Sequence, residues 1–414
     1  MKGRFTVQRH IIQADLSPPP WGDSPADWPV LLRTVRAWTE SAIAEVACPP
    51  SLEGHRLILP DNLLLSPEFL AAFFTGATEY ASEGVLQGHL GAGTSASRSS
   101  GRSDLPPTKD SLPLPLLLIP EAQTTLPQTL DDLRAVCAGA KAVLVDPQDQ
   151  SHSIPAPRAY ADEDGESIEV SASVRVALWM THRSHVQQAN LELLGATFVR
   201  SMARPKFLLS LRYLYERWRP GARRLFSRIG ARSRIHPTAI VEASSLGADC
   251  EIGAYAIVRG SVLGDGVVVE DGAHVQMSCL GSTARIARQT SVFASVLMEG
   301  AHSAQSVMQM SVLGRHSATT SASWFVDVRL GGNVRVEGPN SSLIDAGTRF
   351  LGCDMGHNSF LGAGVTVASG RMLPSNAKIV ADPKAALSKL GSVDPLDGRG
   401  QVFAVRNGQL EALK

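Results

Sequence analysis

The stretch IHPTAIVEASSLGADCEIGAYAIVRGSVLGDGVVVEDGAHV, residues 235–275, decides the fold. Aliphatic residues recur in it in steps of 5, 6 and 6, so the pattern repeats every 17 residues. The series continues beyond this stretch, and each position is Ile, Leu or Val: Ile235, Val241, Leu246, Ile252, Val258, Leu263, Val269, Val275, Leu280, Ile286, Val292 and Leu297. An amphipathic helix needs a period near 3.6 and a hairpin sheet needs strict alternation. The period therefore indicates a solenoid of short repeats.

A coil with three flat sides needs one inward aliphatic side chain per side, with a small residue beside it. Glycine follows the aliphatic residue at Gly247, Gly253, Gly264, Gly281, Gly314, Gly331, Gly352, Gly356 and Gly362, and we attribute these glycines to tight corners. Leu313 and Leu330 extend the 17-residue series with one single-residue slip. We therefore expect a left-handed parallel β-helix of hexapeptide repeats over residues 235–380. Roughly eight coils at the spacing of β-strands would form a prism about 40 Å long.

The repeat is irregular in its second half. It weakens between Met298 and Trp324, where Ser303 and Thr319 take nominal core positions. It stops around 336–342 (VEGPNSS), which predicts a loop extruded from a corner, and it resumes at Met355. Irregular coils and extruded loops are where a solenoid usually carries its function. Residues 381–414 are expected to cap the open end, beginning with a short helix (ADPKAALSKL), because an uncovered coil edge invites aggregation.

Residues 1–183 have a different pattern. HRLILP (55–60) and AKAVLVDP (140–147) are typical of buried strands, and residues 28–46, 67–74 and 130–138 are typical of helices. This alternation predicts an α/β domain. The Ser-, Gly- and Arg-rich segment 91–113 predicts a disordered loop inside it. Residues 184–234 are interpreted as a basic linker, with a long helix from Ser184 to about Trp218.

The composition narrows the function classes. Lys plus Arg (39) equals Asp plus Glu (39), so the charge gives no indication of a nucleic-acid partner. The five cysteines are scattered and form no CxxC pair, which favours free thiols in a reducing compartment. We find no signal peptide and no run of about 18 apolar residues. A cytoplasmic protein is expected, with a position at the inner face of the membrane left open.

A position at the inner face of the membrane is suggested by the basic stretch 200–234, which holds eleven Arg or Lys residues and one acid, Glu216. Aromatic and aliphatic residues lie among the arginines, a mixture suited to an anionic membrane surface. The alternative is a linker helix packed on the first coils, with its arginines paired to acids elsewhere in the protein. We favour the second interpretation.

The run IHPTAIVEASSLGADCEIGAYAIV, residues 235–258, resembles the opening of the hexapeptide-repeat acyltransferases, in particular the UDP-N-acetylglucosamine acyltransferases of lipid A synthesis. The order of parts is similar to that of the bifunctional N-acetylglucosamine-1-phosphate uridylyltransferase/glucosamine-1-phosphate acetyltransferase, which joins an α/β nucleotidyltransferase domain to a β-helix through a helix. The resemblance covers about a third of the chain. It implies a homotrimer, an acyl-CoA or acyl-carrier-protein co-substrate and a small acceptor such as a sugar or nucleotide sugar.

The likeness of the first domain to nucleotidyltransferases is confined to LILPDNLLLSPEFL (57–70). It would make Asp61 the magnesium-binding aspartate at a strand end. The glycine-rich loop that cradles a triphosphate is absent from the sequence. A helix cap at Asp61 or Ser66 is the better interpretation. We expect a nucleotidyltransferase-like domain at most, without catalytic activity.

The resemblance also implies which residue is the catalytic base, because these acyltransferases use a histidine in a His-x-x-x-aliphatic-Gly arrangement. Only His357, in HNSFLG, fits that spacing; His236, His274, His302 and His316 do not. The alternative is a histidine on a coil corner. Around His357 we expect a cofactor site formed by Gly362, Gly364 and Arg371. We also expect a substrate site formed by Asp354, Asn358 and Arg349.

Two further hypotheses were weighed. A zinc site needs three converging imidazoles, but His274, His302 and His316 differ in their offsets along the coils, so we expect no metal. The function expected is acyl transfer with His357 as base. The alternative is a non-catalytic scaffold or nucleotide-sugar-binding protein that keeps the two-domain architecture.

Overall fold

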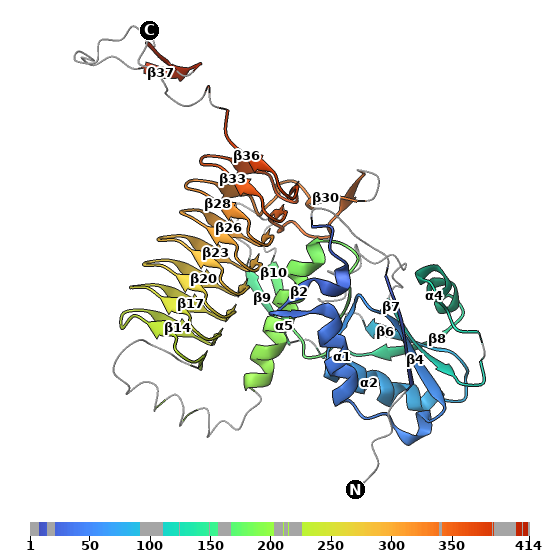
Figure 1. Cartoon of the computed structure of the whole chain (residues 1–414). Helices are drawn as coiled ribbons and strands as arrows, with labels where there is room; N and C mark the ends of the chain where they lie inside the picture. The colour runs from blue at the N-terminus through green and yellow to red at the C-terminus, as the bar shows by residue number, and fades with distance from the viewer. Residues whose placement is uncertain are drawn as a thin grey trace.

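The computed structural model (Figure 1) describes residues 8–14, 21–91, 111–123, 125–148, 150–155, 167–202, 226–338, 342–382, 403–407 and 409–412, with 210, 214 and 384. An N-terminal α/β domain is followed by a helix and then by a left-handed β-helix, as the sequence predicts. The β-helix is a stack of coils whose three faces are parallel sheets. Each face is named below by what covers it.

The docked face lies against the N-terminal domain. Its strands, in order, are β12 (Arg228–Ile229), β15 (Ser245–Leu246), β18 (Val262–Leu263), β21 (Cys279–Leu280), β24 (Val296–Leu297), β27 (Val312–Leu313), β32 (Asp354–Met355) and β35 (Met372–Leu373). The grooved face consists of β13 (Arg234–Ile235), β16 (Glu251–Ile252), β19 (Val268–Val269), β22 (Arg285–Ile286), β25 (His302–Ser303), β28 (Ala318–Thr319), β33 (Phe360–Leu361) and β36 (Lys378–Ile379). The third face consists of β14 (Ile240–Glu242), β17 (Ile257–Arg259), β20 (His274–Gln276), β23 (Ser291–Phe293), β26 (Val307–Gln309), β29 (Trp324–Phe325) and β34 (Thr366–Val367).

The 17-residue register is confirmed by burial. From Val241 to Leu297 every aliphatic position of the series is at most 4% exposed, and all belong to one core cluster. Leu313, Met355 and Leu361 continue the stack and are fully buried. The extension to Leu330 was wrong: this side chain is 68% exposed, because the chain has already left the prism.

The glycines beside the core residues have a different cause from the one expected. A Cβ on Gly247 would lie 2.7 Å from the backbone nitrogen of Asp265 in the next coil, and one on Gly281 would lie 2.5 Å from that of Glu299. Stacked coils thus approach too closely for a side chain. The positive φ angles occur elsewhere, at corner residues such as Asp249, Tyr255 and Met277.

A serine ladder supports the corner before the docked face. Ser244 Oγ accepts a hydrogen bond from Ser261 N, and Ser261 Oγ accepts one from Ser278 N, each at 3.1 Å. Ser278 and Ser295 repeat the contact for the next coils. Each hydroxyl satisfies a buried backbone N–H that the strands leave unpaired.

The extruded loop is longer than the predicted 336–342. It runs from Val326 to Cys353, and it contains the hairpin of β30 (Arg335–Glu337) and β31 (Leu343–Asp345). Val334, Val336, Ala346 and Leu351 form a small core of its own. Ser303 and Thr319 do occupy core positions in the coils before it, fully buried and hydrogen-bonded at 3.3 Å.

The N-terminal domain is built on a mixed five-stranded sheet. In order, the strands are β1 (Gln8–Ile12), β4 (His55–Pro60), β7 (Ser111–Pro120), β6 (Leu86–Gly91) and β8 (Lys141–Val145). β7 runs antiparallel to both its neighbours. The expected loop 91–113 was too wide, because Gly91 and Ser111–Pro113 are strand residues; residues 92–110 lie outside the described part of the chain.

The helices of this domain are α1 (Val35–Glu45), α2 (Pro67–Ala77) and α4 (Leu130–Cys137). α1 starts seven residues after the predicted Trp28, because residues 29–34 form the short hairpin of β2 (Pro29–Val30) and β3 (Arg33–Thr34). Ser66 caps α2 by accepting from Phe69 N at 3.2 Å, and Thr129 and Asp132 form a capping box on α4. Three further strand pairs are β5 (Leu63–Leu65) with β11 (Ala177–Trp179), β9 (Gln150–Pro155) with β10 (Ser167–Ala172), and β37 (Phe403–Arg406) with β38 (Gln409–Ala412).

Helix α5 (Ser184–Met202) lies between the two parts of the molecule (Figure 1). Val186, Ala189 and Leu193 of this helix share one core cluster with outward residues of the docked face, among them Val296, Met298 and Val312. Outward positions of a sheet are normally polar when they meet water. The apolar side chains therefore mark this face as an internal interface.

Part of the basic stretch and the expected cap fall outside the described residues. Residues 203–209, 211–213 and 215–225 are among these, as are 385–402 of the tail. Three of the described arginines make ion pairs within the chain: Arg200 with Glu68, Arg232 with Asp249 and Arg234 with Glu251. In the described residues, no helix is long and apolar enough to cross a membrane.

Candidate functional site

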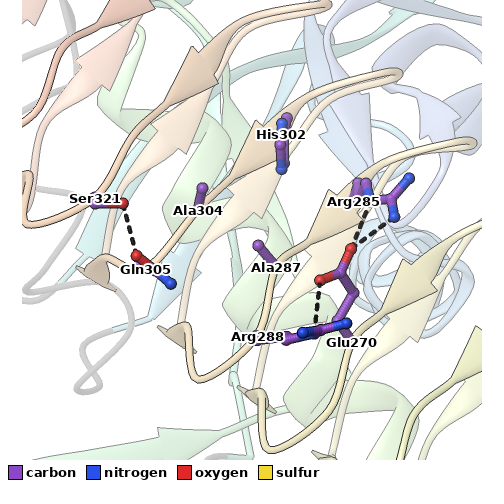
Figure 2. Close-up of a pocket in the computed structure, with 8 residues that line it drawn as sticks. All are labelled: Glu270, Arg285, Ala287, Arg288, His302, Ala304, Gln305 and Ser321. Atoms are coloured by element: carbon purple, nitrogen blue, oxygen red, sulfur yellow. Dashed lines mark hydrogen bonds and ion pairs between the residues drawn. The ribbon is translucent and has the colours of Figure 1, made fainter.

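The grooved face carries a hollow of about 620 Å³ at its middle coils (Figure 2). Strands β22 and β25 supply Arg285 and His302 as outward side chains, directly paired in register. The next outward residue after Arg285 is Ala287, and the next after His302 is Ala304. The equivalent position in the preceding coil is Glu270. Two methyl groups thus replace longer side chains. The hollow exists because the outward column is small at these two coils.

His302 is the chemically notable residue of the hollow. Its Nε2 atom is buried and has no hydrogen-bond partner among the described residues. Burial lowers the pKa of His302, and the guanidinium of Arg285 lowers it further, while Glu270 opposes them. The imidazole is therefore neutral at pH 7, the form that can take up a proton. A buried polar atom without a partner costs about 1–3 kcal/mol.

The charged groups of the hollow belong to one cluster. Arg285 Nε donates to Glu270 Oε1 at 2.8 Å, and Arg288 Nε lies 3.9 Å from Glu270 Oε2. The hydrogen bond from Arg285 is the main cause of the lowered pKa of Glu270. The two guanidiniums and one carboxylate leave an excess of one positive charge, with Arg288 largely exposed. The cluster can therefore attract an anionic ligand.

The hollow continues toward the first coils. A second depression of about 450 Å³ shares Glu270, Arg285 and Arg288 with it and extends to Arg234 and His236. Its floor includes Gly253 and Ala254. The two depressions adjoin at these three shared residues along the grooved face.

His357, the predicted base, lies elsewhere, at the junction of the last coils with the N-terminal domain. Its Nδ1 accepts a hydrogen bond from Arg315 N at 2.8 Å, so the proton of the neutral ring is on Nε2. Nε2 lies 3.1 Å from Asp23 Oδ2 and donates to it. Burial lowers the pKa of His357, against the opposing effect of Asp23. In this arrangement both ring nitrogens are engaged.

The residues predicted to hold a cofactor have different surroundings. Gly362 N donates to Ile379 O at 2.7 Å, and the next coil covers this glycine, so its backbone N–H is already used. Gly364 has a φ of +71° and open space around it. Arg371 forms an ion pair with Glu337 at 3.1 Å.

The predicted substrate residues do not come together around His357 either. Asp354 is buried under the N-terminal domain, where Arg183 donates to it. Asn358 donates to Asn376 Oδ1 at 3.3 Å on the surface. Arg349 lies in the extruded loop, and its carbonyl oxygen accepts from Arg329 N. What the structure brings together instead is Asp354 and Glu337, which both accept from the buried guanidinium of Arg183, and Arg371, which pairs with Glu337.

Asp61 of the N-terminal domain is 6% exposed and has no capping role. It accepts from Ala14 N at 2.9 Å and from Arg36 Nη2 at 3.2 Å. Burial nevertheless raises its pKa. Ser66, the other residue considered, is the helix cap.

The sequence did not single out His302, because it lacks the His-x-x-x-aliphatic-Gly spacing and its coil offset differs from those of His274 and His316. The sequence signal that identifies His302 is a column of outward residues on the grooved face, spaced 17 residues apart. In this column Glu270 is followed by two alanines, Ala287 and Ala304, and His302 lies two residues before the second. No group of three His, Cys, Asp or Glu side chains in the described residues could hold a metal ion.

No family model matches the chain, and no curated protein matches it. One solved structure that matches is the crystal structure of a Bacillus cereus protein described as a "putative acetyltransferase". The match covers 37% of this chain and 71% of that one, at 14% sequence identity and a TM-score of 0.14. The parallel sheets themselves assign residues 228–379 to the left-handed β-helix fold.

Proposed function

We propose that the protein is a transferase that moves an acyl group from a thioester, acyl-CoA or acyl-carrier protein, to a hydroxyl or amine of a small acceptor. The observation that carries the proposal is the hollow of the grooved face, which is lined by His302, an imidazole whose pKa is lowered by burial. Acyl transfer needs a base to take the proton of the nucleophile as the new bond forms. His302 supplies that group.

Arg285 and Arg288 supply the binding charge. Guanidinium groups bind phosphate and carboxylate through paired hydrogen bonds, and the adjoining depression that extends to Arg234 offers a path for an extended donor or acceptor. Arg285 also has an electrostatic role, because its charge beside His302 disfavours the imidazolium. The site therefore combines anion binding with a base that is unprotonated at neutral pH.

A second candidate function is a non-catalytic scaffold. It is favoured by the surroundings of His357, whose two nitrogens are both hydrogen-bonded to the protein. A base needs a free lone pair that faces its substrate. With both ring nitrogens engaged, His357 acts as a structural residue in this second candidate function.

One experiment separates these functions. The purified full chain is incubated with acetyl-CoA and a panel of amino sugars and nucleotide sugars, and products are identified by mass spectrometry. His302→Ala should lower the rate by roughly 10²-fold, the usual contribution of a positioned general base. His316→Ala is the matched control on a coil corner and should leave the rate unchanged.

The other outcomes are equally informative. A loss with His357→Ala but not with His302→Ala would place the base at His357 and refute the site proposed here. No product with any acceptor would favour the scaffold. The homotrimer is part of the same proposal, and a monomer in sedimentation velocity at micromolar concentration would refute it. The docked face is already covered by the chain's own N-terminal domain, so such a trimer would have to form through the other two faces.

A further inference from the structure

Two donors from the last coils converge on one oxygen of the N-terminal domain. Arg315 Nη1 lies 2.6 Å from Asp23 Oδ2, and His357 Nε2 lies 3.1 Å from the same oxygen. Asp23 is 292 residues from Arg315 and 334 residues from His357 in the sequence. The contact therefore joins the two parts of the molecule through a single carboxylate.

The donor character of both groups is fixed by their other contacts. Arg315 N donates to His357 Nδ1, so the ring proton is on Nε2 and points to Asp23. An arginine has no acceptor atom. The β-helix thus presents two N–H donors aimed at one point, an arrangement that binds the oxygen of a carboxylate or phosphate.

Asp23 is held there by its neighbour Trp21. The Trp21 indole Nε1 donates to Met355 O at 3.0 Å, and its ring stacks on that of His357 with centroids 6.4 Å apart. Trp21 is 6% exposed, but the side chains of Asp23 and Arg315 are 29% and 35% exposed. Solvent, and hence a small solute, can reach the ion pair from outside.

We propose that Arg315 and His357 form a binding site for a small carboxylate or phosphate group, and that Asp23 fills this site as an internal ligand. A free anion of that class competes with Asp23 for the two donors, and its binding displaces the Asp23 carboxylate from Arg315 and His357. The site is separate from the hollow that contains His302, so the inference goes beyond the proposed function and does not depend on it.

The competition sets the expected affinities. A tethered ligand acts at a high local concentration, and a site that is open in only about 1–10% of molecules shows an apparent Kd about 10- to 100-fold weaker than its intrinsic value. Removing the Asp23 carboxylate should therefore strengthen anion binding by at least roughly tenfold. Removing Arg315 should abolish it.

The test measures carbethoxylation of His357 by diethyl pyrocarbonate at pH 7, followed by peptide mass spectrometry. Inorganic phosphate and acetate are the two probes, and chloride at equal ionic strength is the reference. In Asp23→Ala, phosphate or acetate should protect His357 at concentrations at least roughly tenfold lower than in the unsubstituted protein. The probe that protects at the lower concentration identifies the ligand chemistry.

Three variants keep the test decisive. Asp27→Ala removes a carboxylate four residues after Asp23 that pairs with Arg36 and not with His357, so it should behave like the unsubstituted protein. Asp23→Ala with Arg315→Gln should lose protection by both anions. Asp23→Asn replaces Asp23→Ala if circular dichroism shows that the alanine variant is unfolded. Equal protection by chloride, or none by either anion in the Asp23 variants, would overturn the proposal.

Discussion

The buried guanidinium of Arg183 offers the sharpest test of how the two parts of the molecule are held together. Its side chain is 2% exposed, and it donates to Asp354, to Glu337 Oε2 at 2.7 Å and to Gly370 O at 3.0 Å. Glu337 keeps a second partner, Arg371, when Arg183 is removed. Asp354 is 6% exposed and loses its guanidinium.

Arg183→Met keeps a long apolar stem and removes the charge. Taking one partner from a buried ion pair typically costs about 3–5 kcal/mol, because the remaining buried charge has lost that partner. Solvent screens the pair very little at these exposures, so we expect a loss in that range. The measurement is the free energy of unfolding from urea denaturation followed by circular dichroism.

The design includes its own controls. Arg183→Met combined with Asp354→Asn removes the buried charge as well, and it should regain most of the loss. Arg232→Met makes the same substitution at an ion pair on the surface of the first coils, with side chains 72% and 50% exposed, and it should shift the urea midpoint little. A loss below about 1 kcal/mol for Arg183→Met, or no recovery in the double variant, would refute the reasoning.

Two further predictions concern the core and the histidines. Leu263→Asp places a charge in the aliphatic stack and should lower the free energy of unfolding, measured by urea denaturation, by several kcal/mol. Val268→Asp, outward on the grooved face, should lower it far less. Equal losses in the two variants would mean that the register is wrong. His302 and His357 both have pKa values lowered from 6.5, so the folded state binds their protons less tightly than the unfolded chain. Stability from these residues is therefore complete above about pH 6.5 and is lost as pH falls through the lower folded pKa values. The urea midpoint should fall between pH 7.5 and 5, and it should fall less in the variant with both histidines changed to Asn; an unchanged pH dependence in that variant would contradict the assignment.

The solenoid could be predicted from the sequence because the contacts that stabilise it are between neighbouring coils. Each coil contacts only the coils above and below it, so the requirement for one inward aliphatic residue per side repeats every 17 residues. Val258, Val275 and Val292 follow one another at that interval for this reason, and all three are buried. The α/β class of the first domain followed from the same kind of local pattern, in strands such as 55–60 and helices such as the one predicted over 67–74, which the structure extends to Ala77.

The surroundings of the candidate site residues could not be predicted in this way. The spacing around His357 was correct as a pattern, but it could not show that Asp23, 334 residues earlier in the chain, would lie against the ring. Likewise, Asp354 was grouped with His357 by proximity in sequence, whereas it pairs with Arg183. Outward side chains take their surroundings from whatever packs on the face, and nothing in the repeat specifies that.

The sequence by itself therefore determined the prism and its register from Val241 to Leu297, because stacking of similar coils makes those features periodic, whereas the full extent of the interruption appeared only in the structure. Only the tertiary structure decided which face meets the N-terminal domain and which residues are left to do chemistry. The apolar outward residues Val296 and Val312 are covered by α5, and two alanines leave His302 beside a hollow on the grooved face. These contacts join residues distant in the chain, and their free energy depends on shape and charge across an interface rather than on any local period.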